Sequence, residues 1–144
     1  MIQQKNLQNS KMIEEFTKTY GTECPKYKKL GNKYYLDNSL PKTTLAPESK
    51  GLFLGEEKNK KFVPSFPFLD IISKSTDKKA IINEKAEWMF LCRRDVLAKS
   101  VIKIHEEGEV LVLNLLGEVL GIGLTKGKGI KNVLDRGDFL RRER

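Results

Sequence analysis

Apolar side chains recur at helical spacing near the start of the chain, over residues 10–20. The stripe consists of Met12, Ile13, Phe16 and Tyr20. Apolar positions three and four residues apart predict an amphipathic helix. Ser10 is a candidate N-cap for this helix, and Gly21 would end it.

Short apolar runs follow, separated by turn residues. Residues 26–30 and 33–36 flank Gly31-Asn32, a dipeptide typical of a β-hairpin. The pattern therefore predicts two antiparallel strands directly after the helix.

The next segments continue this pattern. Residues 41–47, bracketed by two prolines, predict a loop or a short helix. Residues 51–56 and 60–64 predict two further strands. Residues 65–73 predict a short helix with Pro67 in its first turn.

A polar stretch over residues 73–79 separates two differently composed halves, so we place a domain boundary between residues 1–77 and 78–144. In the second half, strands are predicted over residues 80–83, 95–104, 109–114, 118–125 and 130–134, with a last element at 138–141. A short helix is predicted over residues 84–92, with Trp88, Phe90 and Leu91 as candidate core residues. Leu115-Leu116-Gly117 would form a tight hairpin.

Five short strands in about 65 residues, with one or two helices, predict a small mixed β-barrel. We therefore predict an α+β fold, with a small N-terminal α/β domain followed by that barrel. The length of 144 residues suits one ordinary domain or two small ones.

Composition narrows the partners. The chain is 39% hydrophobic and 32% charged, with a formal net charge of +8 and a pI of about 9.5. Such a charge favours nucleic acid or an anionic membrane as the large partner. Membrane insertion is disfavoured, because the longest apolar stretch, residues 110–124, is shorter than the roughly 20 residues needed and contains Asn114, Glu118 and three glycines. The N-terminal residues show no signal-peptide core, so we expect a cytoplasmic protein.

The last nineteen residues concentrate the positive charge. They carry seven basic and three acidic side chains with apolar residues between them. A disordered basic tail would lack that apolar spacing, so the segment predicts a folded strand and turn that presents cations. A fixed cationic surface is what a polyphosphate partner requires.

Residues suited to catalysis are scarce. His105 is the only histidine, and it precedes Glu106 and Glu107 in a segment that reads as an exposed turn. Cys24 and Cys92 lack metal-type spacing and are expected to be free and at least half-buried. Asp135 and Asp138 lie among arginines, where salt bridging or turn capping is favoured over acid–base chemistry. We therefore expect no enzyme activity, no cofactor and no metal.

The glycine-rich segment GIGLTKGKG, residues 121–129, imitates two phosphate-binding motifs. A P-loop needs Gly-x4-Gly-Lys-Ser/Thr, but no glycine stands five positions before Gly127, and Gly129 replaces the hydroxyl residue. The dinucleotide spacing G-x-G-x-x-G fails as well. We interpret the segment as a strand and turn that lets two backbones approach closely.

A second basic cluster comprises Arg93, Arg94, Lys99 and Lys103. Alone it would be a solvated face, but together with the C-terminal cluster and a small barrel it favours an RNA-binding surface. The aromatic residues most accessible for base stacking are Phe139 and one of Tyr34 and Tyr35, although each suits a core position better.

The C-terminal half resembles a PUA domain, the small RNA-binding barrel named after pseudouridine synthases and archaeosine transglycosylases. The resemblance rests on VLVLNLLGEVLGIG and on KNVLDRGDFLRRE, in which residues 137–141 give the Gly-Asp-aromatic-Leu-Arg ending. Together with NEKAEWMFLCRRDVLAKSV, the pattern is similar to the Nip-seven family of ribosome-biogenesis proteins. GLFLGEEKNKKFVPSFPFLDII and NKYYLDNSL are similar to parts of that family's first domain.

This resemblance implies a PUA-type barrel over residues 78–144 that binds pre-ribosomal RNA during assembly of the large ribosomal subunit. It also implies contacts with other assembly proteins through the first domain. Arg93 stands where family members usually have glycine, so the turn there would be strained if its φ were positive. The candidate RNA-binding residues are Arg93, Arg94, Lys99, Lys126, Lys128, Lys131, Arg136, Arg141 and Arg142.

Two alternatives remain open from the sequence. The first is an accessory subunit that positions RNA for a modifying enzyme. About 75 residues before the barrel are too few for a Rossmann methyltransferase domain. The second is a regulator of RNA decay that binds A- or U-rich single strands, which a homopolymer binding series would distinguish.

Overall fold

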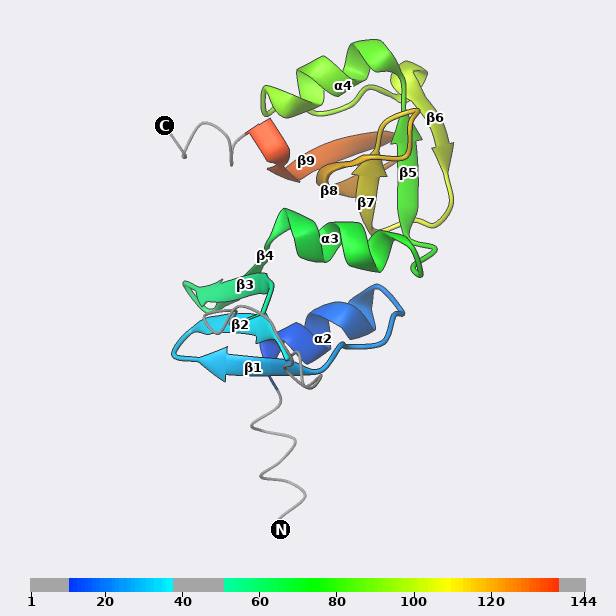
Figure 1. Ribbon diagram of the computed structural model, residues 1–144. Coiled ribbons are helices and arrows are strands. Elements are labelled where there is room, and N and C mark those ends of the chain that lie inside the picture. The colour runs from blue at the N-terminus through cyan, green and yellow to red at the C-terminus, as the bar shows by residue number, and fades with distance from the viewer. Residues whose placement is uncertain (1–10, 38–50, 138–144) are drawn as a thin grey trace. The chain divides into compact units, whose positions relative to one another are not determined.

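A computed structural model describes residues 11–37 and 51–137 (Figure 1). The chain divides into two compact units, unit 1 (Met1–Phe68) and unit 2 (Leu69–Arg144). The division falls within a helix, α3 (Phe66–Ser73), whereas the sequence suggested a boundary in the polar stretch that follows that helix. The predicted elements at residues 41–47 and 138–141 lie outside the described residues.

Unit 1 contains a four-stranded antiparallel sheet in the order β1-β2-β3-β4 (Figure 1). Its elements are α2 (Met12–Thr19), β1 (Tyr27–Leu30), β2 (Lys33–Leu36), β3 (Phe53–Lys58) and β4 (Lys61–Pro64). The predicted hairpin around Gly31 is confirmed, with φ of 64° at that glycine. The second hairpin turns at Asn59 and Lys60, which both have positive φ, as type I′ turns require.

Helix α2 begins one residue later than a Ser10 cap would place it. Its N-cap is Lys11, whose side chain makes no capping hydrogen bond. The end is as predicted: Gly21 has φ of 65° and donates its N–H to the Lys18 carbonyl, while the Thr22 N–H reaches the Thr17 carbonyl. This pair of bonds is a Schellman motif, which satisfies the last carbonyls of the helix.

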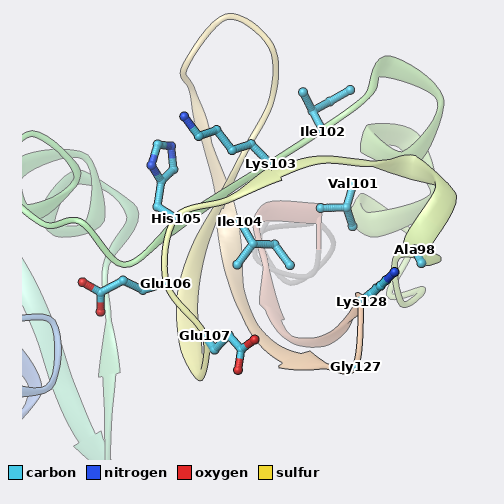
Figure 2. Close-up of a pocket in the computed structure, with 10 residues that line it drawn as sticks. All are labelled: Ala98, Val101, Ile102, Lys103, Ile104, His105, Glu106, Glu107, Gly127 and Lys128. Atoms are coloured by element: carbon cyan, nitrogen blue, oxygen red, sulfur yellow. The ribbon is translucent and has the colours of Figure 1, made fainter.

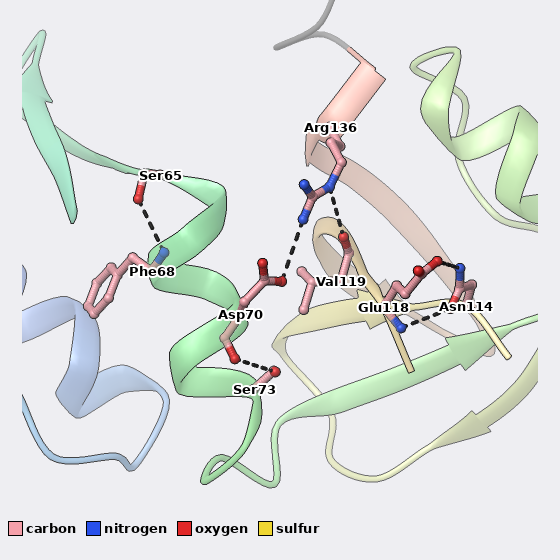
Figure 3. Close-up of polar contacts among 8 residues, drawn as sticks. All are labelled: Ser65, Phe68, Asp70, Ser73, Asn114, Glu118, Val119 and Arg136. Atoms are coloured by element: carbon pink, nitrogen blue, oxygen red, sulfur yellow. Dashed lines mark hydrogen bonds and ion pairs between the residues drawn. The ribbon is translucent and has the colours of Figure 1, made fainter. Parts of the chain in front are cut away.

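Aromatic rings fill the space between α2 and the sheet. Phe62 lies within 5.1 Å of Phe16 and 5.5 Å of Tyr34, measured between ring centroids. Tyr34 is fully buried, which identifies one of the two candidate base-stacking tyrosines as a core residue. Its hydroxyl donates a hydrogen bond to Glu57. Ser65 caps α3 by accepting the N–H of Phe68 at 3.2 Å (Figure 3).

Unit 2 contains a five-stranded mixed sheet in the order β6-β5-β7-β8-β9 (Figure 1). Its elements are β5 (Lys79–Ile82), α4 (Glu84–Leu91), the 3₁₀ turn η1 (Ala98–Ser100), β6 (Val101–Ile104), β7 (Glu109–Leu113), β8 (Val119–Lys126) and β9 (Gly129–Asp135). Among these strands, β5 and β7 pair in parallel and the other neighbours pair antiparallel. The five predicted strands are therefore present, although the strand expected over residues 95–104 is reduced to its last four residues.

Helix α4 buries Ala86 and Phe90 against the sheet. Trp88 was predicted in the core, and this is wrong: its side chain is 70% exposed. At 100° per residue, position 88 lies on the opposite side of the helix from positions 86 and 90, so one apolar stripe cannot include all three. Cys92 is free but exposed, also contrary to expectation, because the helix ends at that residue.

Candidate nucleic-acid interface

The turn that ends α4 carries the first two candidate cations. The Arg93 N–H bonds the Phe90 carbonyl and the Arg94 N–H bonds the Met89 carbonyl, each at 3.0 Å. Arg93 has φ of 69°. This is a Schellman motif with arginine at the position that usually holds glycine, so the anticipated strain of a positive φ is present. Both arginines are exposed.

Hydrogen bonds then tie this turn to β9. Asn132 donates its side-chain amide to the Phe90 carbonyl at 2.8 Å and to the Arg94 carbonyl at 3.4 Å. Asp95 accepts the backbone N–H of Asn132 at 2.9 Å. Val96 and Ile130 exchange two backbone hydrogen bonds. The segment after α4 therefore has a fixed position on β9.

The glycines of the β8–β9 hairpin permit this close approach. A Cβ atom at Gly129 would lie 2.8 Å from the Val96 carbonyl oxygen, and one at Gly123 would lie 2.3 Å from Ile130. Gly127 turns the chain with φ of 62°. The interpretation of residues 121–129 as a strand and turn is confirmed, since they form part of β8, the turn and the start of β9.

The hairpin and η1 bring four of the candidate lysines to neighbouring positions. Lys126 ends β8, Lys128 lies in the turn, Lys131 lies on β9, and Lys99 lies on η1, which contacts β9. All four are exposed. We call these four lysines the basic hairpin surface.

Two hollows adjoin this surface. A hollow of about 220 Å³ is lined by Leu97, Ala98, Lys126 and Lys131, among others. A second, of about 580 Å³, lies between β6 and the hairpin turn (Figure 2). Lys103 and His105 project from the same side of the β6 segment, whereas Glu106 and Glu107 lie at its far end. The second hollow is therefore of mixed charge, and His105 lies in an exposed bend as predicted.

Arg136 lies apart from the basic hairpin surface. Its Nε donates to the Val119 carbonyl at 3.2 Å and its Nη2 is 3.5 Å from Asp70 of α3 (Figure 3). It follows the C-terminal end of β9 at Asp135, which lies about 13 Å along the strand from Lys131 at roughly 3.3 Å per residue. Its guanidinium therefore supports α3 and the start of β8, rather than joining the lysines.

Arg141, Arg142, Asp138 and Phe139 lie outside the described residues. Asp135 is only 2% exposed and so belongs to the interior of unit 2. The described part of the chain holds no group of three or more side chains that could bind a metal ion. Nor do residues 11–37 and 51–137 include a helix long and apolar enough to cross a membrane.

Three residues of the site were missed by sequence reasoning. Asn132 organises the turn, Asp95 fixes the backbone of β9, and Leu97 is 65% exposed beside Lys126 and Lys131. Asn132 offers no sequence signal, because its partners lie about forty residues away. Leu97 falls within the strand predicted over residues 95–104, whereas in the structure it directly precedes the turn η1.

Three comparisons bear on the identity of this fold. Residues 78–144 match the family model described as the UPF0113 PUA domain. A UPF0113 protein of Archaeoglobus fulgidus is 30% identical over 115 residues, which are 69% of this chain and 66% of the relative. The chain thus spans just under two thirds of that relative's length.

A solved structure described as a conserved PUA domain protein from Thermoplasma acidophilum superposes with a TM-score of 0.60, at 17% identity, and covers 94% of each chain. At that identity the likeness shows the fold. It confirms the predicted PUA-type barrel within a mixed α and β chain. On this evidence, residues 78–144 match the UPF0113 PUA domain family, and the chain has a PUA-type fold.

Proposed function

We propose that this protein binds RNA, without catalysing a reaction, through the basic hairpin surface of unit 2. The observation that carries the proposal is the gathering of Lys99, Lys126, Lys128 and Lys131 by the β8–β9 hairpin and η1. PUA domains generally bind RNA, and the net charge of +8 favours a polyanion.

The lysines would bind phosphates as mobile point charges, which makes affinity depend strongly on salt. Arg94, in the turn fixed by Asn132, would add a guanidinium that can donate two hydrogen bonds to one phosphate. Leu97 stands among these charges and offers an apolar contact to a base or a ribose. Arg136 is left out of the surface because its contacts lie elsewhere.

We further propose that the RNA is pre-ribosomal RNA of the large subunit and that the protein assists maturation of that subunit in the cytoplasm. The resemblance to the Nip-seven family supports this role. Assembly proteins would bind at unit 1 on the same basis. RNA crosslinked to the protein in cells should map to large-subunit ribosomal RNA, whereas crosslinks confined to A- or U-rich messages would overturn this assignment.

The interface is tested with Lys126→Gln/Lys131→Gln in the full chain. We expect weaker RNA binding by anisotropy, with a log–log salt slope that is shallower by about 0.7 to 0.9 for each phosphate that the variant no longer neutralises. Lys85→Gln, an exposed lysine on α4, is the matched control. Unchanged affinity and slope in the folded double variant would exclude this surface.

The absence of catalysis is tested separately. His105→Gln, Cys24→Ser and Cys92→Ser together should leave RNA binding and biological complementation intact. Loss of complementation by a folded, RNA-binding triple variant would argue for chemistry at one of these residues.

A further inference from the structure

The sheet of unit 1 has a second face, turned away from α2. Strand side chains alternate between faces, and the inward face is fixed by Phe62, whose ring packs with Phe16 of α2 and with the buried Tyr34. Tyr35 therefore points outward. A bulge places Leu54 in the core and pairs Tyr35 with Phe53 across the two central strands. We call the side that carries Tyr35 and Phe53 the outer sheet face.

Two aromatic rings occupy the middle of this face. The rings of Tyr35 and Phe53 are 5.6 Å apart between centroids and tilted by 58°. Phe53 is 36% exposed and Tyr35 is partly exposed. The face thus offers exposed aromatic surface on β2 and β3, the two central strands of the sheet.

Lysines surround the two rings. Lys28 lies opposite Tyr35 in the β1–β2 register, Lys33 lies two residues before Tyr35, and Lys58 and Lys61 pair beyond them on β3 and β4. These four lysines are exposed. Against them stand Asp37, 4.0 Å from Lys28, and Glu56, 4.0 Å from Lys58. Cations outnumber anions on this face, which disfavours a basic protein partner and favours a polyanion.

We propose that the outer sheet face binds single-stranded RNA. Unpaired bases stack on Tyr35 and Phe53, and Lys28, Lys33 and Lys61 contact the flanking phosphates. Stacking on aromatic rings and neutralisation by nearby cations are the two interactions that single-stranded nucleic acid requires, whereas a duplex keeps the faces of its bases covered. This site lies in unit 1 and is additional to the basic hairpin surface of unit 2.

The test measures binding of a labelled ten-nucleotide uridine strand and of a blunt RNA duplex to the full chain. In Tyr35→Leu/Phe53→Leu the rings are removed but the apolar bulk stays. We expect about a five- to tenfold loss of affinity for the single strand, in line with the removal of base stacking, and little change for the duplex. Lys33→Gln/Lys61→Gln should weaken binding and flatten its salt dependence.

Two controls separate this site from the other possibilities. Lys18→Gln changes an exposed lysine on α2, off this face, and Trp88→Leu removes an exposed aromatic ring of unit 2. Both should leave the affinity for the single strand unchanged. If only Lys126→Gln/Lys131→Gln weakens binding, the outer sheet face is excluded while the basic hairpin surface stands. Unchanged affinity in the ring variant would also be the result if this face bound a protein instead.

A direct mapping keeps the proposal testable if the ring variant folds poorly. Photocrosslinking of a 4-thiouridine strand to the unaltered protein should label peptides that contain Tyr35 or Phe53. Labelling confined to residues 78–144 would overturn the proposal.

Discussion

At the scale of single residues, Arg93 shows local strain retained in a well-formed turn. Its φ of 69° and the two Schellman hydrogen bonds are what glycine supplies without strain. The sequence identified the position by resemblance, but it could not say whether the turn would change. In the structure the turn has Schellman geometry, and Asn132 of β9 donates hydrogen bonds to its Phe90 and Arg94 carbonyls.

Arg93→Gly should therefore stabilise the protein. We expect the free energy of unfolding to rise by about 1 kcal/mol, the cost of a left-handed conformation minus part of the entropy that glycine adds to the unfolded chain. Urea unfolding followed by far-UV circular dichroism measures it. Lys85→Gly, inside α4, should instead destabilise by about 1 kcal/mol. A destabilised Arg93→Gly would mean that the arginine side chain makes stabilising contacts that outweigh the strain.

Two tyrosines of unit 1 link stability to alkaline pH. Burial raises the pKa of Tyr34, and its hydrogen bond to Glu57 adds to the effect; burial and Glu14 likewise raise the pKa of Tyr27. The folded state therefore holds both phenol protons more tightly than the unfolded state. Stability from this source is complete below pH of about 10, the unfolded pKa, and is lost as pH rises above it.

Tyr27→Phe/Tyr34→Phe should remove that dependence. Between pH of about 9 and 11, the free energy of unfolding of the double variant should fall less steeply than that of the parent. Parallel slopes for the two proteins would show that these phenols titrate alike in both states. The variant itself should be somewhat less stable at neutral pH, because it lacks two hydrogen bonds to carboxylates.

At the scale of elements, the sequence predicted what depends on near neighbours. The hairpin at Gly31, the two further strands of unit 1, the end of α2 and the five strands of unit 2 follow from turn residues and apolar spacing. It failed where a distant contact decides the outcome. The bridge between Val96 and Ile130 and the turn η1 replace the first part of the strand predicted over residues 95–104, of which only β6 remains. The candidate lysines of the hairpin were named correctly as surface residues, but their proximity to Leu97 could not be predicted from spacing.

Arg136 was also predicted on the RNA-binding surface from sequence alone, whereas its contacts lie elsewhere. We therefore expect its substitution to affect the stability of the protein more than its affinity for RNA. Arg136→Gln should lower the free energy of unfolding by about 1–2 kcal/mol through loss of the hydrogen bond to Val119. Asp70→Asn should cost less than about 1 kcal/mol, because the ion pair is partly exposed. RNA affinity of the folded Arg136→Gln variant should change by no more than about twofold if the residue is off the interface. A larger loss in a fully folded variant would return Arg136 to the RNA-binding surface.

At the scale of the whole molecule, the boundary between the two units falls within α3, and this bears on where the chain can be divided. Leu69 and Ile72 are buried and Asp70 pairs with Arg136. A fragment that begins at the predicted boundary, residue 78, lacks the first three of these residues.

We therefore expect residues 65–144 to unfold cooperatively and at a higher midpoint than residues 78–144. Ser65 is kept in the longer fragment because it caps α3. Thermal melts by circular dichroism compare the two fragments. Equal midpoints would show that α3 contributes nothing to the stability of unit 2.

The exposed position of Trp88 has an optical consequence. It is the only tryptophan of the chain, and at 70% exposure its indole is already largely in water in the folded state. Emission from this indole will hardly shift when the protein unfolds, so intrinsic fluorescence will under-report denaturation here. The same insensitivity makes it a selective reporter: a blue shift on mixing with another macromolecule would mark contact at α4 itself.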